Sequence, residues 1–470
     1  MQPTTRVTRH TLALAFSTLA LTGCLGPKYT RPTVQAPPAF RGADDAAVAT
    51  EAANSLGDQK WTEVFQQPEL QELIKTALAN NYDLRIAAQR VLEYQSQVKI
   101  ARAAQFPSLS AGGTGAGADL PSSVGSSIAN PLVIGSFNLQ ASWTPDFWGL
   151  YRKQTQAARE DLLAQTWAQR AVRVTLVQQV VTGYLQLRML DEQLKIATDT
   201  AGIRKDSLDL TRKLESAGSS PLSDVRQAEQ LYYTATEQIP VLEEQIQQNE
   251  NAMRLLLGQT PGTVVHTAPD ALAPPPQALP TGIPSQLLER RPDIQQAEAN
   301  LRAANARVGV ARAAFFPSLA ISGSAGLGGD TFPNIFSSDS KTIYGLGNLT
   351  QPIFAGGQIR GKYDLSKQQK EELVLTYQKT ILGAFRDVSN ALIAVNKSKA
   401  AREQQERLVS AARDATRLAQ MRYKAGSTSY LEVLTVSSNE FSAELQLATL
   451  QETEALTLVQ LYAALGGGWQ

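Results

Sequence analysis

A seven-residue motif occurs twice in this chain, first as Ala103-Ala104-Gln105-Phe106-Pro107-Ser108-Leu109 and again as Ala313-Ala314-Phe315-Phe316-Pro317-Ser318-Leu319. In both copies a charged segment with helical character ends, and a segment rich in Ser and Gly begins. Proline cannot continue a helix, and it favours an extended conformation in the residue before it. The two copies, about 210 residues apart, therefore predict the same turn from helix to strand at Pro107 and at Pro317.

The composition excludes several classes of function. The chain has 470 residues and a net charge of +1, and its charged residues, 19% of the total, form no basic block. Nucleic acid is therefore not an expected partner, because phosphate neutralisation requires clustered Lys and Arg. Cys24 is the only cysteine, and His10 and His266 are the only histidines. A zinc site or a catalytic triad would depend on His266 alone, and the sequence has no nucleotide-binding loop, so we expect no enzyme, no metal and no cofactor.

The N-terminus predicts a secreted precursor. Arg6 and Arg9 form a basic region, and residues 12–21 form an apolar run that is far shorter than the roughly 20 residues needed to span a bilayer. Leu21-Thr22-Gly23-Cys24 follows and resembles the bacterial lipobox. We therefore expect residues 1–23 to be a signal peptide.

The lipobox resemblance implies that Cys24 is acylated and anchors the chain in lipid. The alternative is a plain signal peptide with an incidental cysteine, but this cysteine stands at the position that the motif requires. Several acyl chains make a durable anchor. Residue 25 is Leu rather than Asp, which by resemblance favours sorting to the outer membrane. Residues 24–60, rich in Pro, Ala and Asp without periodicity, are expected to form an extended, lipid-anchored tether.

Residues 61–258 form the first of two predicted repeats. Apolar and polar residues alternate within 136–145, which is typical of a strand with one apolar face. A later run without proline carries apolar residues at a spacing of three and four, as in a long helix of coiled-coil type. The predicted elements are strands at about 108–118 and 136–145, a long helix at about 151–217 and a return helix at about 221–257.

The same pattern returns after a Pro-rich linker at 259–292. Its landmarks follow those of the first repeat with an offset of about 208 residues, which indicates an internal duplication. The second repeat, 293–470, has predicted strands at about 318–327 and 343–352, a long helix at about 357–425 and a last helix at about 429–465.

The four predicted strands impose a requirement for assembly. Their length of about ten residues matches transmembrane β-strands. In lipid a sheet must close into a barrel, and known barrels have at least eight strands. Four strands cannot close alone, so the chain must share a barrel with other copies. The alternative, a soluble four-stranded sheet, is disfavoured because the stretches 136–145 and 318–329 contain no charged residue.

The helix lengths predict a helical wall. The two shorter helices of the first repeat total about 60 residues, close to the long helix beside them, so they could stack end to end along it. Pro240 predicts a kink in the return helix. Gly183 and Gly383 lie in the middle of the long helices, where each costs about 1 kcal/mol relative to Ala. They either allow close helix packing or have no specific role.

Several motifs resemble the TolC family of outer-membrane efflux proteins, and in particular its lipoprotein branch of NodT type. The motifs are the lipobox, the twin Phe-Pro-Ser-Leu turns, Arg291-Pro292-Asp293-Ile294, Tyr423-Lys424-Ala425-Gly426 and the ending Tyr462-Ala463-Ala464-Leu465-Gly466-Gly467-Gly468-Trp469. The resemblance implies a mixed α and β membrane protein. It would be a homotrimer whose long antiparallel helices form a periplasmic α-barrel, and each chain would contribute four strands to a shared 12-stranded transmembrane β-barrel.

The resemblance also implies a gate. Asp224 and Tyr423 match family positions at which a tyrosine of one coil bonds an aspartate of the other and holds the pore shut. The alternative is that Asp224 only interacts with the helix dipole and that Tyr423 only packs. Glu432 matches one position of an acidic ring. The family's nearby arginine is replaced by Thr428, and Thr435 replaces the second carboxylate, so we expect a weaker cation-binding ring.

The hairpin tips and the partners follow from the same resemblance. The tips would contact a periplasmic adaptor protein through Gly218, Ser219, Gly426 and Ser427. The expected function is a passive exit duct for small molecules such as drugs, working with this adaptor and an inner-membrane pump of the resistance-nodulation-division type. Two alternatives remain open: the duct of a type I protein-secretion system, and a structural coiled-coil lipoprotein that spans the periplasm.

Overall fold

The computed structural model describes residues 27–42, 55–118, 132–266, 284–329 and 337–469. The expected signal peptide, the expected lipid anchor Cys24 and part of the expected linker lie outside the described residues. The chain divides into two compact units. The sheet unit comprises Met1–Pro32, Arg90–Gln165 and Gln296–Tyr377, and the hairpin unit comprises Thr33–Gln89, Thr166–Gln295 and Gln378–Gln470.

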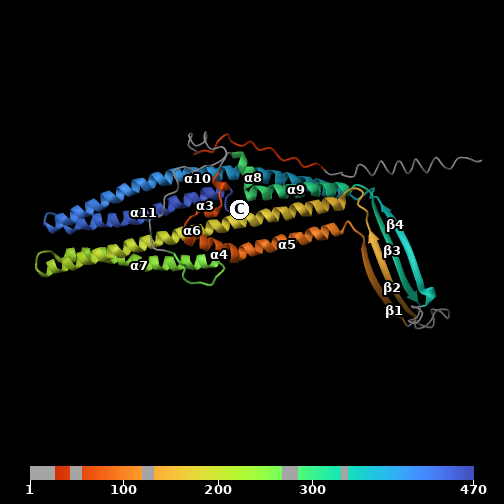
Figure 1. The fold of residues 1–470 in the computed structure, drawn as a ribbon, viewed down its shortest axis with the longest axis horizontal. Coiled ribbons are helices and arrows are strands. Elements are labelled where there is room, and N and C mark those ends of the chain that lie inside the picture. The colour runs from red at the N-terminus through yellow and green to blue at the C-terminus, as the bar shows by residue number, and fades with distance from the viewer. Residues whose placement is uncertain (1–26, 43–54, 119–131, 267–283, 330–336, 470) are drawn as a thin grey trace, which may run out of the picture. The chain divides into compact units, whose positions relative to one another are not determined.

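The predicted class is confirmed: the chain has long antiparallel helices, four strands and an internal duplication. Two repeats follow one another (Figure 1): in the described residues each has short helices, two strands, a long helix and a return helix, and the first has one short helix more than the second. The helices of the first repeat are α3 (Trp61–Val64), α4 (Pro68–Asn80), α5 (Tyr82–Ala103), α6 (Leu150–Ser216) and α7 (Leu222–Leu256). The helices of the second repeat are α8 (Leu287–Arg290), α9 (Pro292–Ala313), α10 (Gln358–Lys424) and α11 (Tyr430–Ala464). Short 3-10 turns lie at Leu56–Asp58, Pro284–Gln286 and Ser338–Ser340.

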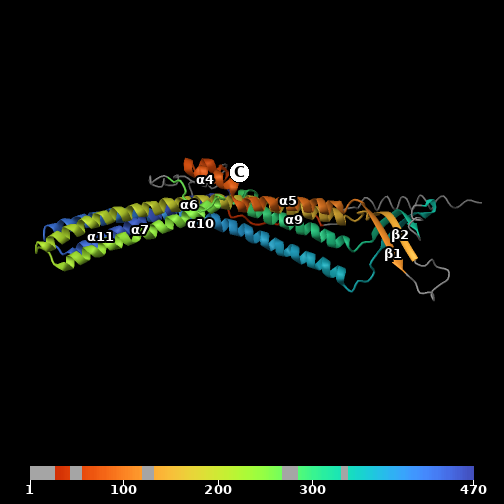
Figure 2. The same cartoon turned by 90° about the horizontal axis from the view of Figure 1, so that it is seen from below.

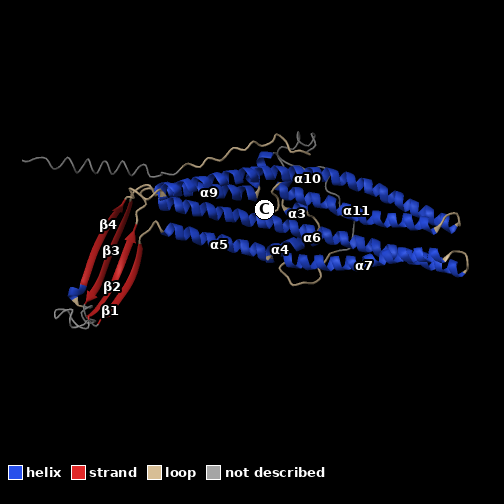
Figure 3. Cartoon of the chain, turned by 180° about the vertical axis from the view of Figure 1, so that it is seen from behind, coloured by secondary structure: helices blue, strands red, loops and turns tan. Residues whose placement is uncertain are grey.

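The sheet unit contains one antiparallel sheet with the strand order β1-β2-β3-β4, coloured red in Figure 3. Its strands are β1 (Ser108–Ala118), β2 (Leu132–Trp143), β3 (Ser318–Gly329) and β4 (Lys341–Thr350). The pairing of β2 with β3 joins the two repeats. The ends of β2 and β4 come two residues earlier than expected from the sequence. The reason is that Pro145 and Pro352 follow, and proline cannot donate a ladder hydrogen bond.

Large apolar side chains of this sheet are exposed in the single chain. Phe137 of β2 is 62% exposed and Ile343 of β4 is 85% exposed, and every residue of β4 is exposed. In the described part of the chain, β1 and β4 each have a partner strand on one side only. The sheet therefore has two free edges.

The twin proline turns have the same geometry. The amide of Phe106 donates to the carbonyl of Ala103 (3.0 Å), and the amide of Phe316 donates to the carbonyl of Ala313 (3.1 Å). Each turn leads directly into a strand, β1 or β3. Trp148 connects the repeats, because its indole stacks on Phe316 with 4.9 Å between ring centroids and donates to the Pro317 carbonyl at 2.7 Å.

In the hairpin unit, α6 and α7 form one antiparallel hairpin, and α10 and α11 form the other (Figures 1 and 3). A buried cluster joins the hairpins near their turns, and a second cluster continues it along the helices. The first cluster is Leu208, Val225, Ala228, Leu231, Ala419, Tyr430 and Val433. The second is Leu190, Ala197, Ala201, Ala235, Leu242 and Phe441. The helix α4 lies alongside α6 in this unit (Figure 2), where Tyr184 Oη is 3.5 Å from Glu69 Oε2.

The shorter helices meet end to end at two junctions. Where α7 ends and α5 begins, Asn81 Nδ2 donates to the Leu256 carbonyl at 3.0 Å. Where α11 ends and α9 begins, Arg291 Nη1 donates to the Ala464 carbonyl at 3.1 Å. The helix α7 continues through Pro240. Among the described residues, no helix is long and apolar enough to cross a membrane.

Residues 27–32, within the segment expected to be a tether, have no helix or strand, and they are bound to the rest of the sheet unit. Tyr29 and Arg31 lie against α9, where both contact the carboxylate of Glu298 at 3.3 and 2.9 Å. Arg302 of α9 also pairs with Glu298 (2.6 Å), which is only 2% exposed. Burial, followed by the charge of Glu298, raises the pKa of Tyr29 to about 12. The buried carboxylate thus fixes residues 29–31 to the sheet unit.

Candidate gate at the hairpin tips

The two hairpin tips have the same backbone geometry. Gly218 and Gly426 have φ angles of +74° and +71°, which is the left-handed conformation that favours glycine at the end of a helix. The amide of the next residue reaches back five residues in both turns: Ser219 donates to Leu214 at 2.8 Å, and Ser427 donates to Arg422 at 2.9 Å. These bonds satisfy carbonyls that the helix ends leave free.

The four residues expected to contact an adaptor are exposed at these tips. Gly218 and Ser219 lie between α6 and α7, and Gly426 and Ser427 lie between α10 and α11. A Cβ atom added to either glycine would meet no atom within 4 Å. The tips therefore present open surface to their surroundings.

The expected gate pair is in contact. Tyr423 Oη of α10 donates to Asp224 Oδ2 of α7 at 3.2 Å, so the bond joins one hairpin to the other. Burial, followed by the negative charge of Asp224, raises the pKa of Tyr423 to about 12. The phenol therefore keeps its proton at neutral pH and acts as the donor. Packing contributes as well, because the Tyr423 ring meets the buried Tyr430 ring edge to face at 5.0 Å.

Glu432 is not a free carboxylate at the tip. Arg422 pairs with one of its oxygens at 2.7 Å, and the Thr428 hydroxyl donates to the other. Thr435 donates its hydroxyl to the carbonyl of Leu431 in its own helix (2.9 Å). Since Glu432 is already neutralised by Arg422, the tip carries less negative charge than the acidic residues alone would give.

Sequence reasoning missed several residues that join the hairpins near the tip. Tyr430 is 2% exposed, and its hydroxyl lies 3.1 Å from the Ser207 hydroxyl of α6. Arg204, one turn further along α6, is buried in the same region. The available signal was spacing: Arg204, Ser207 and the apolar Leu208 lie on one face of α6 at intervals of three and four residues.

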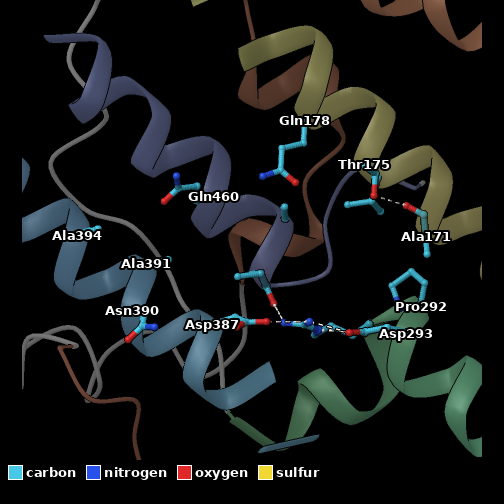
Figure 4. A pocket seen from close by; sticks show the side chains of 14 residues that line it. Ala171, Thr175, Gln178, Pro292, Asp293, Asp387, Asn390, Ala391, Ala394 and Gln460 are labelled. Atoms are coloured by element: carbon cyan, nitrogen blue, oxygen red, sulfur yellow. Dashed lines mark hydrogen bonds and ion pairs between the residues drawn. The ribbon is translucent and has the colours of Figure 1, made fainter. Parts of the chain in front are cut away.

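A cavity of about 570 Å³ lies in the hairpin unit at the junction of α9 and α11. Figure 4 shows Gln178 of α6, Asn390 of α10 and Gln460 of α11 around it. Arg291 forms one wall, and its guanidinium pairs with Asp293 at 2.7 Å and with Asp387 at 3.3 Å. The motif Arg291-Pro292-Asp293-Ile294 therefore builds the helix junction described above.

The remaining expected sites are the two proline turns and the lipid-attachment residue. Pro107 and Pro317 lie at the turns from α5 to β1 and from α9 to β3. Cys24, the expected lipid-attachment residue, lies outside the described residues. Within the described ranges, no group of three or more His, Cys, Asp and Glu side chains could hold a metal ion.

Comparisons with known proteins agree with this arrangement. The model of the outer membrane efflux protein family matches residues 73–259 and 283–467. The chain is 34% identical over 474 residues to a toluene efflux pump outer membrane protein, TtgC, of Pseudomonas putida, and the match covers 98% of this chain and 96% of TtgC. It is 32% identical over 453 residues to the cation efflux system protein CusC of Escherichia coli, and that match covers 96% of this chain and 97% of CusC.

A solved structure shows the same fold. The crystal structure of the open state of the Neisseria gonorrhoeae MtrE outer membrane channel matches with a TM-score of 0.81 and 28% sequence identity, over 95% of this chain and 99% of that one. A duplicated chain with two long helical hairpins and a four-stranded sheet thus has the fold of an outer-membrane channel protein. The chain belongs to the outer membrane efflux protein family. It is a channel protein of the outer membrane that acts in efflux.

Proposed function

We propose that three copies of this chain form the exit duct of a tripartite efflux system. The observation that carries the proposal is the pair of free sheet edges at β1 and β4. In lipid, the unpaired N–H and C=O groups of these edges must find partners, and only a closed barrel provides them. Three copies would supply twelve strands, which exceeds the eight that known closed barrels require.

The exposed apolar side chains of the sheet support a location in lipid. Phe137, Ile343, Leu346 and Leu349 are each more than half exposed in the single chain. Such a surface is unfavourable in water and favourable against acyl chains. An acylated Cys24 would add an anchor to outer-membrane lipid beside the barrel.

The proposed partners meet the duct at the hairpin tips. The turns at Gly218, Ser219, Gly426 and Ser427 are exposed, and the two glycines face open space. We propose that a periplasmic adaptor binds these four residues. The adaptor would connect the duct to an inner-membrane pump of the resistance-nodulation-division type, and this pump would supply the energy for transport.

The cargo is set by the pump rather than by the duct in this proposal. The relatives are named for toluene efflux and for cation efflux, which are chemically unlike cargoes, although this chain covers nearly the whole of both. One duct architecture thus serves molecules of different polarity. Small molecules such as drugs and solvents are the proposed cargo class here.

Assembly tests the duct directly. In detergent, the purified mature protein should migrate as a heat-modifiable particle with the mass of three chains and a β-sheet component in its circular dichroism. In planar lipid bilayers it should conduct ions. A monomer that conducts no ions would contradict the duct and would favour the structural lipoprotein.

The gate is tested by removing the bond between the hairpins. Tyr423→Phe combined with Asp224→Ala deletes both partners of the bond, and we expect ion conductance through reconstituted trimers to rise by about tenfold, because a hydrogen bond to a charged group is worth roughly 1.5–3 kcal/mol. Tyr233→Phe is the matched control, since Tyr233 is 60% exposed on α7. Conductance equal to that of the wild type would remove the gate assignment while leaving the duct intact.

A further inference from the structure

Arg204 joins the two hairpins through a single guanidinium group. This residue of α6 is 3% exposed. Its Nη1 donates to the Leu231 carbonyl of α7 at 2.8 Å, and its Nη2 donates to the Ser437 carbonyl of α11 at 3.1 Å. The first bond lies within one hairpin, whereas the second crosses to the other. The planar fork of arginine can make both bonds at once.

The charge of Arg204 is compensated without an ion pair. Among the described residues, no carboxylate lies within 4 Å of its guanidinium, and Nε has no hydrogen-bond partner. Burial lowers the pKa of Arg204. Its Cζ lies 4.9 Å from the centre of the Phe441 ring of α11, which provides a cation–π contact. A buried cation that pairs with no carboxylate directly is costly, so the two carbonyls and this ring must replace its lost hydration, together with the more distant negative charge of Glu440.

Arg204 extends a row of polar contacts between the hairpins. The bond from Tyr423 to Asp224 lies nearest the tip, and the hydroxyl pair of Ser207 and Tyr430 follows. Arg204 lies three residues before Ser207 on α6, and therefore on the same face of the helix. If the hairpins separate from the tip, the contact between Arg204 and Ser437 is the next to break after the pair of Ser207 and Tyr430.

A cavity beside Arg204 makes release of this contact physically feasible. Its volume is about 470 Å³, and Arg204, Ser437 and Phe441 line it together with Thr416 and Glu440. Polar and charged side chains surround this space, so water can enter it and hydrate the guanidinium. The cation therefore has a solvated alternative to the Ser437 carbonyl when α11 moves.

We propose that Arg204 is a second lock of the gate, a positioning residue that holds α11 against α6 until the hairpins separate. This inference rests on the proposed duct function. The bond between Tyr423 and Asp224 breaks first, and the contacts of Arg204 break after it. Full opening requires that the bond from Arg204 to Ser437 and its contact with Phe441 both break. The bond to Leu231 stays within its hairpin and is kept.

The test replaces the guanidinium group of Arg204 and keeps the apolar part of its side chain. Arg204→Met removes both hydrogen bonds and the charge, and we expect openings of reconstituted trimers to become about tenfold more frequent, given the strength of hydrogen bonds to charged groups. Arg204→Lys keeps the charge but has no planar fork, so it should give an intermediate frequency. Arg212→Met is the matched control. Arg212 is an exposed arginine of the same helix that pairs with Glu229 of α7 (2.9 Å), within one hairpin only.

The outcomes separate the lock from a purely structural role. A structural role predicts that Arg204→Met lowers the temperature at which the trimer dissociates but leaves the opening frequency equal to that of Arg212→Met, and this result would overturn the proposal. If Arg204→Met fails to assemble, the comparison of Arg204→Lys with Arg212→Lys decides in the same way. A wild-type protein that forms no conducting trimer would instead refute the duct itself.

Discussion

At the end of α7 the side-chain amide of Asn81 donates to the Leu256 carbonyl, whereas at the end of α11 the guanidinium of Arg291 donates to the Ala464 carbonyl. The two junctions occupy the same place in the two repeats. The first is neutral and compact. The second is charged, pairs Arg291 with two aspartates and borders a cavity. The two repeats thus share a backbone arrangement at this junction, but different side chains join the helix ends.

The backbone constraints at these junctions are shared. Gly258 and Gly466 follow α7 and α11 with φ angles of +68° and +83°. A Cβ atom on Gly258 would lie 2.5 Å from the Asn80 carbonyl oxygen, and one on Gly466 would lie 3.3 Å from the backbone of Arg290. Close approach of two helix ends requires glycine in both repeats, so this requirement comes from the fold itself.

At the turns from helix to strand, too, the two repeats share a backbone arrangement and differ in the side chains that complete it. Trp143 Nε1 donates to the Gln105 carbonyl at 3.1 Å, and in the second repeat Gln351 Nε2 donates to the Phe315 carbonyl at 3.2 Å. An indole and an amide thus satisfy equivalent carbonyls. A carbonyl at the end of a helix needs a donor, but several side chains can provide it.

The largest effect is expected from exchanging the junction residues. Asn81→Arg should destabilise the protein by about 3 kcal/mol or more, because Asn81 is 3% exposed and an arginine there would be a buried cation in a compact site. Arg291→Asn should cost roughly 2 kcal/mol, since it loses the ion pairs with the partly exposed Asp293 and Asp387. Thermal unfolding of both variants measures the difference.

Asn81→Ala is the control for the exchange. This variant loses the bond to Leu256 and the helix cap in which Asn81 Oδ1 accepts from the Leu84 amide, but it buries no charge. It should therefore be less harmful than Asn81→Arg. Equal stability of Asn81→Arg and the wild type would mean that the neutral junction tolerates charge, and the proposed divergence would then have no energetic basis.

The second prediction concerns the segments that follow the helices α7 and α11. After α7, His266 holds the chain to α6: Nε2 lies 2.9 Å from Asp191 Oδ2, and Nδ1 lies 2.8 Å from the Val264 carbonyl. The hydrogen bond to Asp191 raises the pKa of His266 to about 9, with smaller contributions from the Val264 carbonyl and from the charges of Asp191 and Glu250. After α11, Trp469 is held instead by Arg170, whose Cζ lies 4.7 Å from the indole ring.

The sign of the pH effect follows from the raised pKa. The His266 contribution is fully present below the ordinary pKa of 6.5 and is lost as the pH rises through about 9. We expect the free energy of unfolding to fall by roughly 1 kcal/mol between the two pKa values, allowing for partial solvent screening. The unfolding temperature, measured as a function of pH, should fall with it. His266→Asn should remove this slope, whereas Trp469→Phe should leave it unchanged. An identical slope in His266→Asn would assign the pH dependence to another group.

Much of the fold could be predicted because it depends on local signals. Proline positions and the alternation of apolar residues predict the strands, and the positive-φ glycines mark the helix ends. The pair of Asp224 and Tyr423 could be predicted only by resemblance, since the two residues are 199 positions apart. Arg204 could not be predicted, because its partners are backbone carbonyls and carry no side-chain signal in the sequence. Arg422, which neutralises Glu432, was missed because charged residues are common near helix ends.

The smallest effect is expected at the two glycines in the middle of the long helices. Gly183 is closely packed: a Cβ atom there would lie 2.9 Å from Met253 Cγ, and Asn249 Nδ2 donates to the Gly183 carbonyl at 3.1 Å. Gly383 has no atom within 4 Å of the corresponding position. The sequence left two alternatives for these glycines, close helix packing or no specific role. Within the single chain, Gly183 fits the first alternative and Gly383 fits the second.

Alanine at each position sharpens this contrast. Gly383→Ala should stabilise the protein by roughly 0.5–1 kcal/mol, because alanine has the higher helix propensity and meets no obstacle. Gly183→Ala should gain the same stabilisation from helix propensity, but the cost of moving Met253 to make room should offset this gain. Thermal unfolding and trimer content are measured together. If Gly383→Ala weakens the proposed trimer while Gly183→Ala does not, then Gly383 packs against a second copy of the chain, and both glycines serve close helix contact.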